Sequence, residues 1–138
     1  MVPLEEAAMH PNDVQLISVF AREKGQHIQS KLVTGKIGFE IVAQARSGNA
    51  LFGTGARYRM MVTLRNLTSP KNIAFEACLG PGNFGDSQWA TPSLSHVFEV
   101  PRLESMTRPH ICEIIAVLEV GIAAPNITFA TSAPLMLI

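Results

Sequence analysis

Two of the four histidines lie in segments patterned as strands, and histidine is the side chain best suited to act as a general base near neutral pH. His96 precedes Glu99 by three residues, so one hypothesis is a small enzyme whose general base is oriented by a carboxylate. We favour the alternative, a half-exposed strand histidine, because no Gly-x-Ser-x-Gly elbow accompanies it. His110 and Cys112 share one face of a strand, but a metal site needs three or four ligands. We therefore predict no catalytic residues, no metal and no cofactor, and keep an enzyme using His96 or His110 as a third hypothesis.

The carboxylates are sparse and scattered. Asp13 and Asp86 are the only aspartates, and neither has an acidic neighbour in the sequence. Calcium loops need several oxygen ligands close together, and glycoside hydrolysis needs two facing carboxylates, so neither function is predicted. Glu113 and Glu119 interrupt the most apolar segment of the chain. A carboxylate there needs either a partner or a solvated strand face. Arg57, Arg59 or Arg65 of a neighbouring strand is the natural partner.

Three arginines project from one face of the alternating segment that runs from Ala56 to Leu67. They are Arg57, Arg59 and Arg65. Such a row could bind phosphates or an acidic partner, whereas the alternative is a solvated face paired with glutamates, in which each pair contributes little. Eleven basic and eleven acidic residues cancel, which favours the second interpretation and predicts binding to neither nucleic acid nor a membrane surface.

Two glycine-rich loops, predicted at 46–55 and 80–93, carry large apolar side chains among small polar residues. These side chains are Leu51, Phe52, Phe84 and Trp89. The loop at 80–85 lacks the Lys-Ser/Thr pair of a phosphate-binding loop, so we predict no nucleotide site. Rigid aromatic anchors among adaptable neighbours are typical of binding loops, and we predict that these four residues contact a protein partner. Two alternatives remain: the aromatic rings cap the core, or Tyr58, Phe84 and Trp89 stack on a carbohydrate.

The segments that must position these residues alternate apolar and polar side chains with a period of two, which is typical of strands. In the 56–67 segment Tyr58, Met60, Val62 and Leu64 occupy the face opposite the arginines, and a helix cannot place them on one side. Further strands are predicted at 13–21, 28–33, 36–45, 73–79, 94–100, 111–120 and 127–138, the last one bent or split at Pro134. The 68–72 turn predicts an antiparallel hairpin. Isoleucine and valine dominate 111–120, which predicts a central strand buried on both faces rather than a helix.

Seven to nine short strands without a long amphipathic helix predict an antiparallel β-sandwich of immunoglobulin-like or related topology. A jelly roll or a closed barrel is the alternative. At 138 residues the chain fits one domain, which we place at 13–138 after an N-terminal arm at 1–12. Cys78 and Cys112 each fall in a predicted strand. They are either buried free thiols or a single bridge between the sheets.

The function predicted from these features is a non-catalytic protein-interaction or assembly module. Only 16% of the residues are charged, so part of the surface is expected to be covered by another chain or by uncharged polar residues. The chain ends in Ala-Pro-Leu-Met-Leu-Ile, and such an apolar end must be tucked into a sheet or must pair with a second chain. The sandwich-end loops and this terminal strand are therefore the predicted contacts, with a partner protein or with itself. The acidic N-terminus lacks a signal-peptide pattern, which favours the cytoplasm.

Overall fold

The alternating segment after Ala56 is strand β4 (Arg57–Asn66) in the computed structural model, which describes residues 10–68, 73–103, 109–121 and 125–138. Tyr58, Met60, Val62 and Leu64 are at most 1% exposed, whereas the arginines between and beyond them point outward. A strand sends successive side chains to opposite faces, so the sequence pattern fixes which face joins the core.

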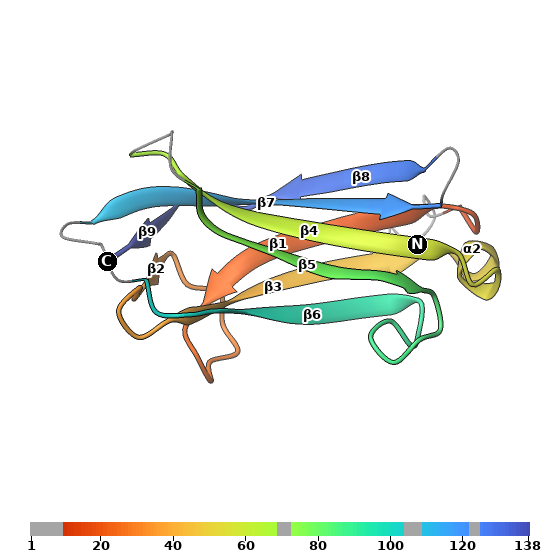
Figure 1. Ribbon diagram of the computed structural model, residues 1–138, viewed down its shortest axis with the longest axis horizontal. Helices are drawn as coiled ribbons and strands as arrows, with labels where there is room; N and C mark the ends of the chain where they lie inside the picture. The colour runs from red at the N-terminus through yellow and green to blue at the C-terminus, as the bar shows by residue number, and fades with distance from the viewer. Residues whose placement is uncertain (1–9, 69–72, 104–108, 122–124) are drawn as a thin grey trace, which may run out of the picture.

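Two sheets pack face to face, and the protein is an all-β sandwich. The three-stranded sheet has the order β1 (Val14–Arg22), β3 (Phe39–Ser47) and β6 (Ser93–Val100), with antiparallel neighbours. The six-stranded sheet has the order β2 (Leu32–Val33), β9 (Leu135–Leu137), β7 (His110–Val120), β4 and β5 (Ile73–Asn83), and β8 (Asn126–Thr131) also pairs with β7. In Figure 1, β7, β4 and β5 lie side by side in front of β1 and β3. The immunoglobulin-like strand order stays a prediction.

The strand predictions hold for most segments, and the β4–β5 hairpin is antiparallel as expected. The six-stranded sheet is nevertheless mixed, because β2 pairs with β9 in parallel. The predicted strand at 28–33 shrinks to Leu32–Val33, and the predicted loop at 46–55 contains a short helix, α2 (Asn49–Gly53). Strand β5 also continues into the expected 80–93 loop, through a cis Gly80–Pro81 bond as far as Asn83.

The prediction that β7 is buried on both faces is wrong. Its buried side chains alternate with exposed or half-exposed ones, so that Ile114 and Leu118 are fully buried while Ile111 is 48% exposed. The strand is central in its sheet, between β4 and the edge formed by β8 and β9. A central position covers both edges of a strand, but only one face of this sheet lies against the other sheet. The apolar residues on the outer face are left uncovered.

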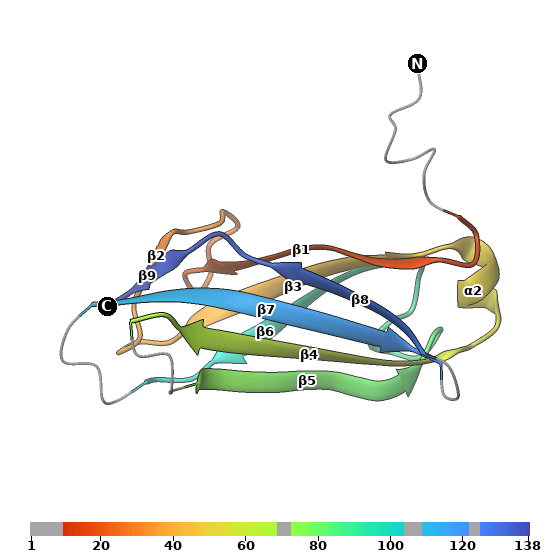
Figure 2. The same ribbon diagram turned by 90° about the horizontal axis from the view of Figure 1, so that it is seen from above.

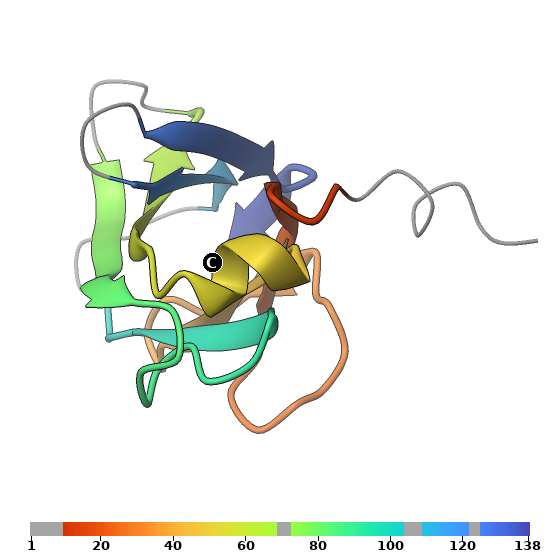
Figure 3. The same ribbon diagram turned by 90° about the vertical axis from the view of Figure 1, so that its right-hand side faces the viewer.

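The two sheets come together on one side of the sandwich. Figures 2 and 3 show β8 running close to β1, and the Leu16 amide donates a hydrogen bond to Thr128 Oγ1 over 3.4 Å. Strands β5 and β6 form the opposite edges of the two sheets, and β2 ends the six-stranded sheet beyond β9. One cluster of buried apolar residues, from Val14 in β1 to Leu137 in β9, fills the space between the sheets.

The ends of the chain and the cysteines also bear on the predictions. Most of the predicted arm lies outside the described residues, but the Pro11 carbonyl accepts a hydrogen bond from the Leu51 amide, so this part is fastened to α2.

Cys78 and Cys112 are free thiols. The expectation that a free Cys78 is buried is wrong, because its side chain points out of the six-stranded sheet. No helix in the described chain is long and apolar enough to cross a membrane.

Candidate functional site

The loop aromatics that sequence reasoning assigned to partner contacts form a cluster inside the sandwich end. Trp89 is completely buried and Phe84 is 5% exposed. The Phe84 ring lies edge-on to Trp89 with centroids 4.8 Å apart, and stacks on Tyr58 at 5.7 Å and on Phe52 at 5.4 Å. The prediction that Phe84 and Trp89 are surface anchors is therefore wrong, and a carbohydrate cannot stack on Tyr58, Phe84 or Trp89 as they are placed. Leu51 and Phe52 remain partly exposed, so their contact with a partner stays a prediction.

Asp86 is the residue that turns this loop inward. Its carboxylate accepts hydrogen bonds from the backbone amides of Asn83, Gln88 and Trp89, over 2.9 to 3.1 Å, and from the Tyr58 hydroxyl at 2.9 Å. Burial opposes ionisation of Asp86, but these donors outweigh it and lower its pKa below the usual value. Burial, reinforced by the bonded carboxylate, raises the pKa of Tyr58 to about 12.

Among the described residues, neither His96 nor His110 is bonded to a carboxylate that could orient it as a general base. The His96 ring lies on the inner face of β6, edge-on to Phe98 with centroids 4.6 Å apart, and burial lowers its pKa. Glu99 is three residues away and therefore projects from the opposite face. His110 Nδ1 is 2.9 Å from Asn66 Nδ2. Within the described residues no carboxylate bonds to either ring, and no cluster of side chains could hold a metal ion.

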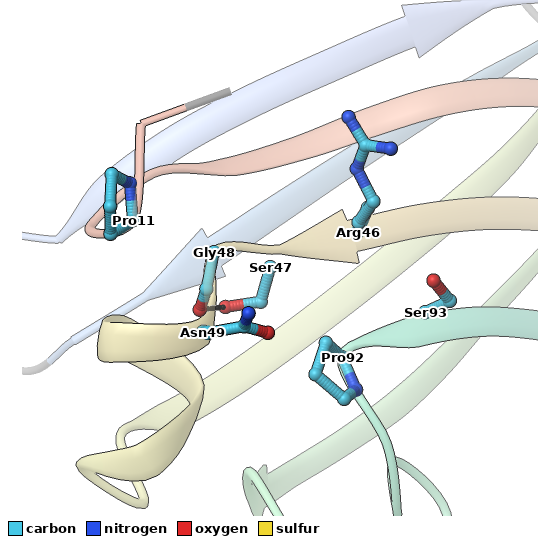
Figure 4. A pocket seen from close by; sticks show the side chains of 7 residues that line it. All are labelled: Pro11, Arg46, Ser47, Gly48, Asn49, Pro92 and Ser93. Atoms are coloured by element: carbon cyan, nitrogen blue, oxygen red, sulfur yellow. Dashed lines mark hydrogen bonds between the residues drawn. The ribbon is translucent and has the colours of Figure 1, made fainter. Parts of the chain in front are cut away.

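A cleft of about 340 Å³ lies where the three-stranded sheet meets α2 (Figure 4). The Arg46 guanidinium extends beside β1 and points away from Ser47 and Asn49, and its buried Nε has no hydrogen-bond partner among the described residues. Ser47 Oγ donates to the Gly48 carbonyl over 3.1 Å. The lining residues include hydroxyls, but none is a histidine or carboxylate that could activate one. We assign this cleft no chemistry.

The outer face of the six-stranded sheet, by contrast, gathers exposed apolar side chains from several strands. The described chain exposes nine large apolar side chains, and five of them lie on this face: Leu32, Ile111, Ile127, Phe129 and Met136. Phe129 is 71% exposed. Monomeric proteins expose single apolar residues commonly, but aligned groups of them mark contact surfaces.

The strand register arranges these side chains in rows across the face. One row crosses four strands in the order Phe129, Val117, Met61 and Cys78. The next row crosses the same strands in the order Thr131, Ile115, Thr63 and Glu76, so it ends in an exposed carboxylate on β5. Neighbouring residues in such rows have Cβ atoms about 5 Å apart, so the side chains form a continuous surface. We call the four residues of the first row, together with Ile115 and Thr63 of the second, the central band.

Charged pairs bound the central band at both ends. Arg59 lies opposite Glu119 at one end, and Arg65 lies opposite Glu113 at the other, with a distance of 3.8 Å between Arg65 Nη1 and Glu113 Oε1. The predicted pairing of Glu113 with an arginine of a neighbouring strand is confirmed. The Arg59 guanidinium contacts Met61 Sδ at 3.3 Å.

The predicted arginine row is exposed, but a neighbouring glutamate reduces its positive electrostatic potential. Arg57 and Arg59 line a shallow cleft of about 220 Å³ together with Glu119. A carboxylate in the same cleft opposes an incoming phosphate or carboxylate. Anion binding by Arg57, Arg59 and Arg65 stays a prediction, and this arrangement does not favour it.

The apolar terminal strand is tucked into its sheet. Leu135 and Leu137 are buried, and β9 lies between β2 on one side and β7 on the other. Of the two possibilities that the sequence left open, the structure shows the first one. Both edges of β9 are occupied, so strand addition to a second chain would require β2 or β7 to leave.

Sequence reasoning missed the outer face, although a signal for it was present. Ile111, Ile115 and Val117 sit at alternate positions among the apolar residues of one strand. The apolar run predicts burial between two layers, but it equally fits a strand whose second face is covered by a partner protein. No known protein-family model matches this sequence, and none of the curated proteins is similar to it.

Proposed function

We propose that this protein is a non-catalytic protein-binding module whose working surface is the outer face of the six-stranded sheet. The observation that carries the proposal is the central band, beside which the exposed Ile127 lies at the sheet edge. Burying such side chains contributes about 25 cal/mol per Å² of apolar surface removed from water, which favours a protein partner over solvent.

The contrast between the two sheets supports this choice of surface. On the outer face of the three-stranded sheet, edge strand β6 presents the exposed polar residues Ser93, Ser95 and Glu99 together with the partly buried Val97. Val97 is in one row with Val42, which is buried, and Phe20, which is partly buried. Strand β7 presents Ile111, Ile115 and Val117 at the corresponding places on its own sheet. A sheet face that needs no partner is normally polar. The apolar row on the three-stranded sheet is buried or partly buried within the chain, whereas Ile111 on β7 is 48% exposed. The partner surface therefore lies on one side of the sandwich.

The charges on the face favour a protein partner of mixed charge. Arg59 and Arg65 on β4 stand beside Glu119 and Glu113 on β7, so neither sign dominates. A nucleic acid or an anionic membrane would require an unbalanced basic surface. We expect the apolar band to supply the affinity and the charged pairs to set the orientation of the partner.

Site-directed photo-crosslinking in the native cells tests this proposal. A photo-reactive amino acid replaces Ile127 on the outer face, and in a matched variant it replaces Ile17 on β1 of the other sheet. The two isoleucines are 56% and 54% exposed, so the probe is equally accessible at both positions. We expect discrete protein adducts from position 127 and none of comparable yield from position 17.

The result that contradicts the proposal is an absence of adducts from position 127, or equal adducts from both positions. Circular dichroism of each purified variant must first show the wild-type fold. Mass spectrometry of an adduct then identifies the partner, whether a different protein or a second copy of this chain.

A further inference from the structure

We propose that the occupant of the outer face is a second copy of the chain, packed face to face in a two-fold symmetric dimer. This inference rests on the proposed function and names its partner. The observation behind it is the register of β4 against β7, in which Arg59 stands opposite Glu119 and Arg65 opposite Glu113.

A two-fold axis that runs parallel to the strands, midway between β4 and β7, makes the face complementary to itself. Rotation about this axis keeps each residue at its height along the strands and exchanges β4 of one copy with β7 of the other. Arg59 then faces Glu119 of the second copy, and Arg65 faces its Glu113. Each basic side chain meets an acidic one, and the four contacts are two symmetric pairs.

The same operation brings apolar side chains together between the charged ends. Met61 faces Val117 of the second copy, and Thr63 faces its Ile115, because these residues are also opposite one another in the register. In the isolated chain Met61, Ile115 and Val117 are only partly buried. Phe129 and Cys78 end one row, so Phe129 faces Cys78 of the second copy. Thr131 and Glu76 end the other row, so Thr131 faces Glu76 of the second copy. An apolar centre with charges at its ends is the usual arrangement of a specific interface.

Charge-reversal variants test this geometry by sedimentation velocity over a range of concentrations. Arg59→Glu and Glu119→Arg each place like charges in both symmetric contacts, and we expect each to raise the dissociation constant of the dimer by about 100-fold. When the two variants are mixed, every contact again joins an acidic side chain to a basic one. The mixture should therefore dimerise within about tenfold of the wild-type dissociation constant, although neither variant does so alone.

Matched controls make the same charge changes away from the face. Arg102→Glu lies in the segment after β6, and Glu99→Arg lies on the outer face of the three-stranded sheet; both residues are exposed. We expect both controls to keep the wild-type dissociation constant. Thermal unfolding followed by circular dichroism establishes that all four variants are folded, since Arg59 and Glu119 are also neighbours within one chain.

The wild-type protein supplies a second measurement that needs no substitution. Cys78 is exposed at the end of the central band, whereas Cys112 is fully buried, so an added disulfide reagent reports on Cys78 alone. In the dimer Phe129 of the second copy covers Cys78, and its labelling rate should fall at least several-fold as the protein concentration rises through the dissociation constant. A labelling rate independent of concentration contradicts the arrangement.

A wild-type chain that stays monomeric at every concentration overturns the inference, and so does a mixture of the two variants that fails to dimerise while wild type does. The proposed function survives the first of these results if the probe at position 127 still links the chain to a different protein. The proposed function fails as well if the probe at position 127 yields no adduct, or no more than the probe at position 17.

Discussion

Replacing Asp86 by alanine should destabilise the protein by about 2–4 kcal/mol. The carboxylate is the hydrogen-bond acceptor of the buried Tyr58 hydroxyl, and a buried hydroxyl left without an acceptor costs about 1–3 kcal/mol. The substitution also removes the acceptor of three backbone amides in the loop that carries Trp89. Water replaces part of that loss because the loop is exposed at Gln88, so we add about 1 kcal/mol, as for a lost helix cap.

Urea unfolding followed by the fluorescence of Trp89 measures this change, because it is the only tryptophan and is completely buried in the folded state. Tyr58→Phe removes the donor instead and should cost about 1–2 kcal/mol, and the double variant should cost less than the sum of the two single variants. A strictly additive double variant would show that the two groups do not interact.

The pH dependence of the same variants provides an independent check. The hydrogen bonds lower the pKa of Asp86 in the folded protein, so its contribution is complete above the ordinary carboxyl pKa of 3.8. As the pH falls through the lowered pKa, Asp86 becomes protonated in the folded as well as in the unfolded state. Its contribution to the free energy of unfolding is then lost. The difference between wild type and Asp86→Ala should therefore be constant from pH 5 to 7 and should shrink below pH 4. A difference that does not change with pH would refute the role assigned to the charge.

Three further predictions follow from the same sandwich end and from the cysteines. Because the pKa of Tyr58 is raised to about 12, wild type should lose stability between about pH 10 and pH 12 relative to Tyr58→Phe, as seen by urea unfolding at each pH. Gly82→Ala should destabilise by about 1–3 kcal/mol, since a Cβ there would lie 2.7 Å from the Tyr58 hydroxyl and closer still to the Asp86 carboxylate. The control Gly53→Ala, where nothing lies within 4 Å, should be neutral or stabilising by up to about 1 kcal/mol in the same assay. In dilute folded protein an aromatic disulfide reagent should titrate one thiol per chain, Cys78, because Cys112 is buried with a pKa raised to about 11; two thiols titrating together before unfolding would contradict this placement.

The strands were predictable because period-two alternation is a local property of the sequence. In β4 Tyr58, Met60, Val62 and Leu64 face the core, and the arginines face outward together with Met61. The positions at which strands end were less predictable. Gly80 to Asn83 are composed like a loop, yet they continue β5, because the partner strand β4 hydrogen-bonds to them whatever their propensity.

The position of the aromatics could not be decided from composition. Small polar residues surround the aromatic residues of binding loops and of loops that cap a core, so the composition around Phe84 and Trp89 fits both. The two kinds of loop differ only in the direction in which the backbone turns. Here the Asp86 carboxylate gathers amides from both sides of itself, and this turn carries both rings inward. An aspartate after a glycine is a signal for such a turn, but its acceptor role toward Tyr58 depends on a contact between residues 28 positions apart.

The low charge of the chain and the uncovered face of the six-stranded sheet have one physical explanation. An antiparallel sheet in a two-layer sandwich has one dry face and one wet face, so a strand such as β7 should carry polar residues at every second position. Its outer positions instead hold Ile111, Ile115 and Val117, and only Glu113 and Glu119 are charged. Exchanging those three residues for polar ones would leave the core untouched, so the fold itself does not require them. We propose that contact with another surface accounts for them, and that the paired charges at both ends of the band set the orientation of that surface.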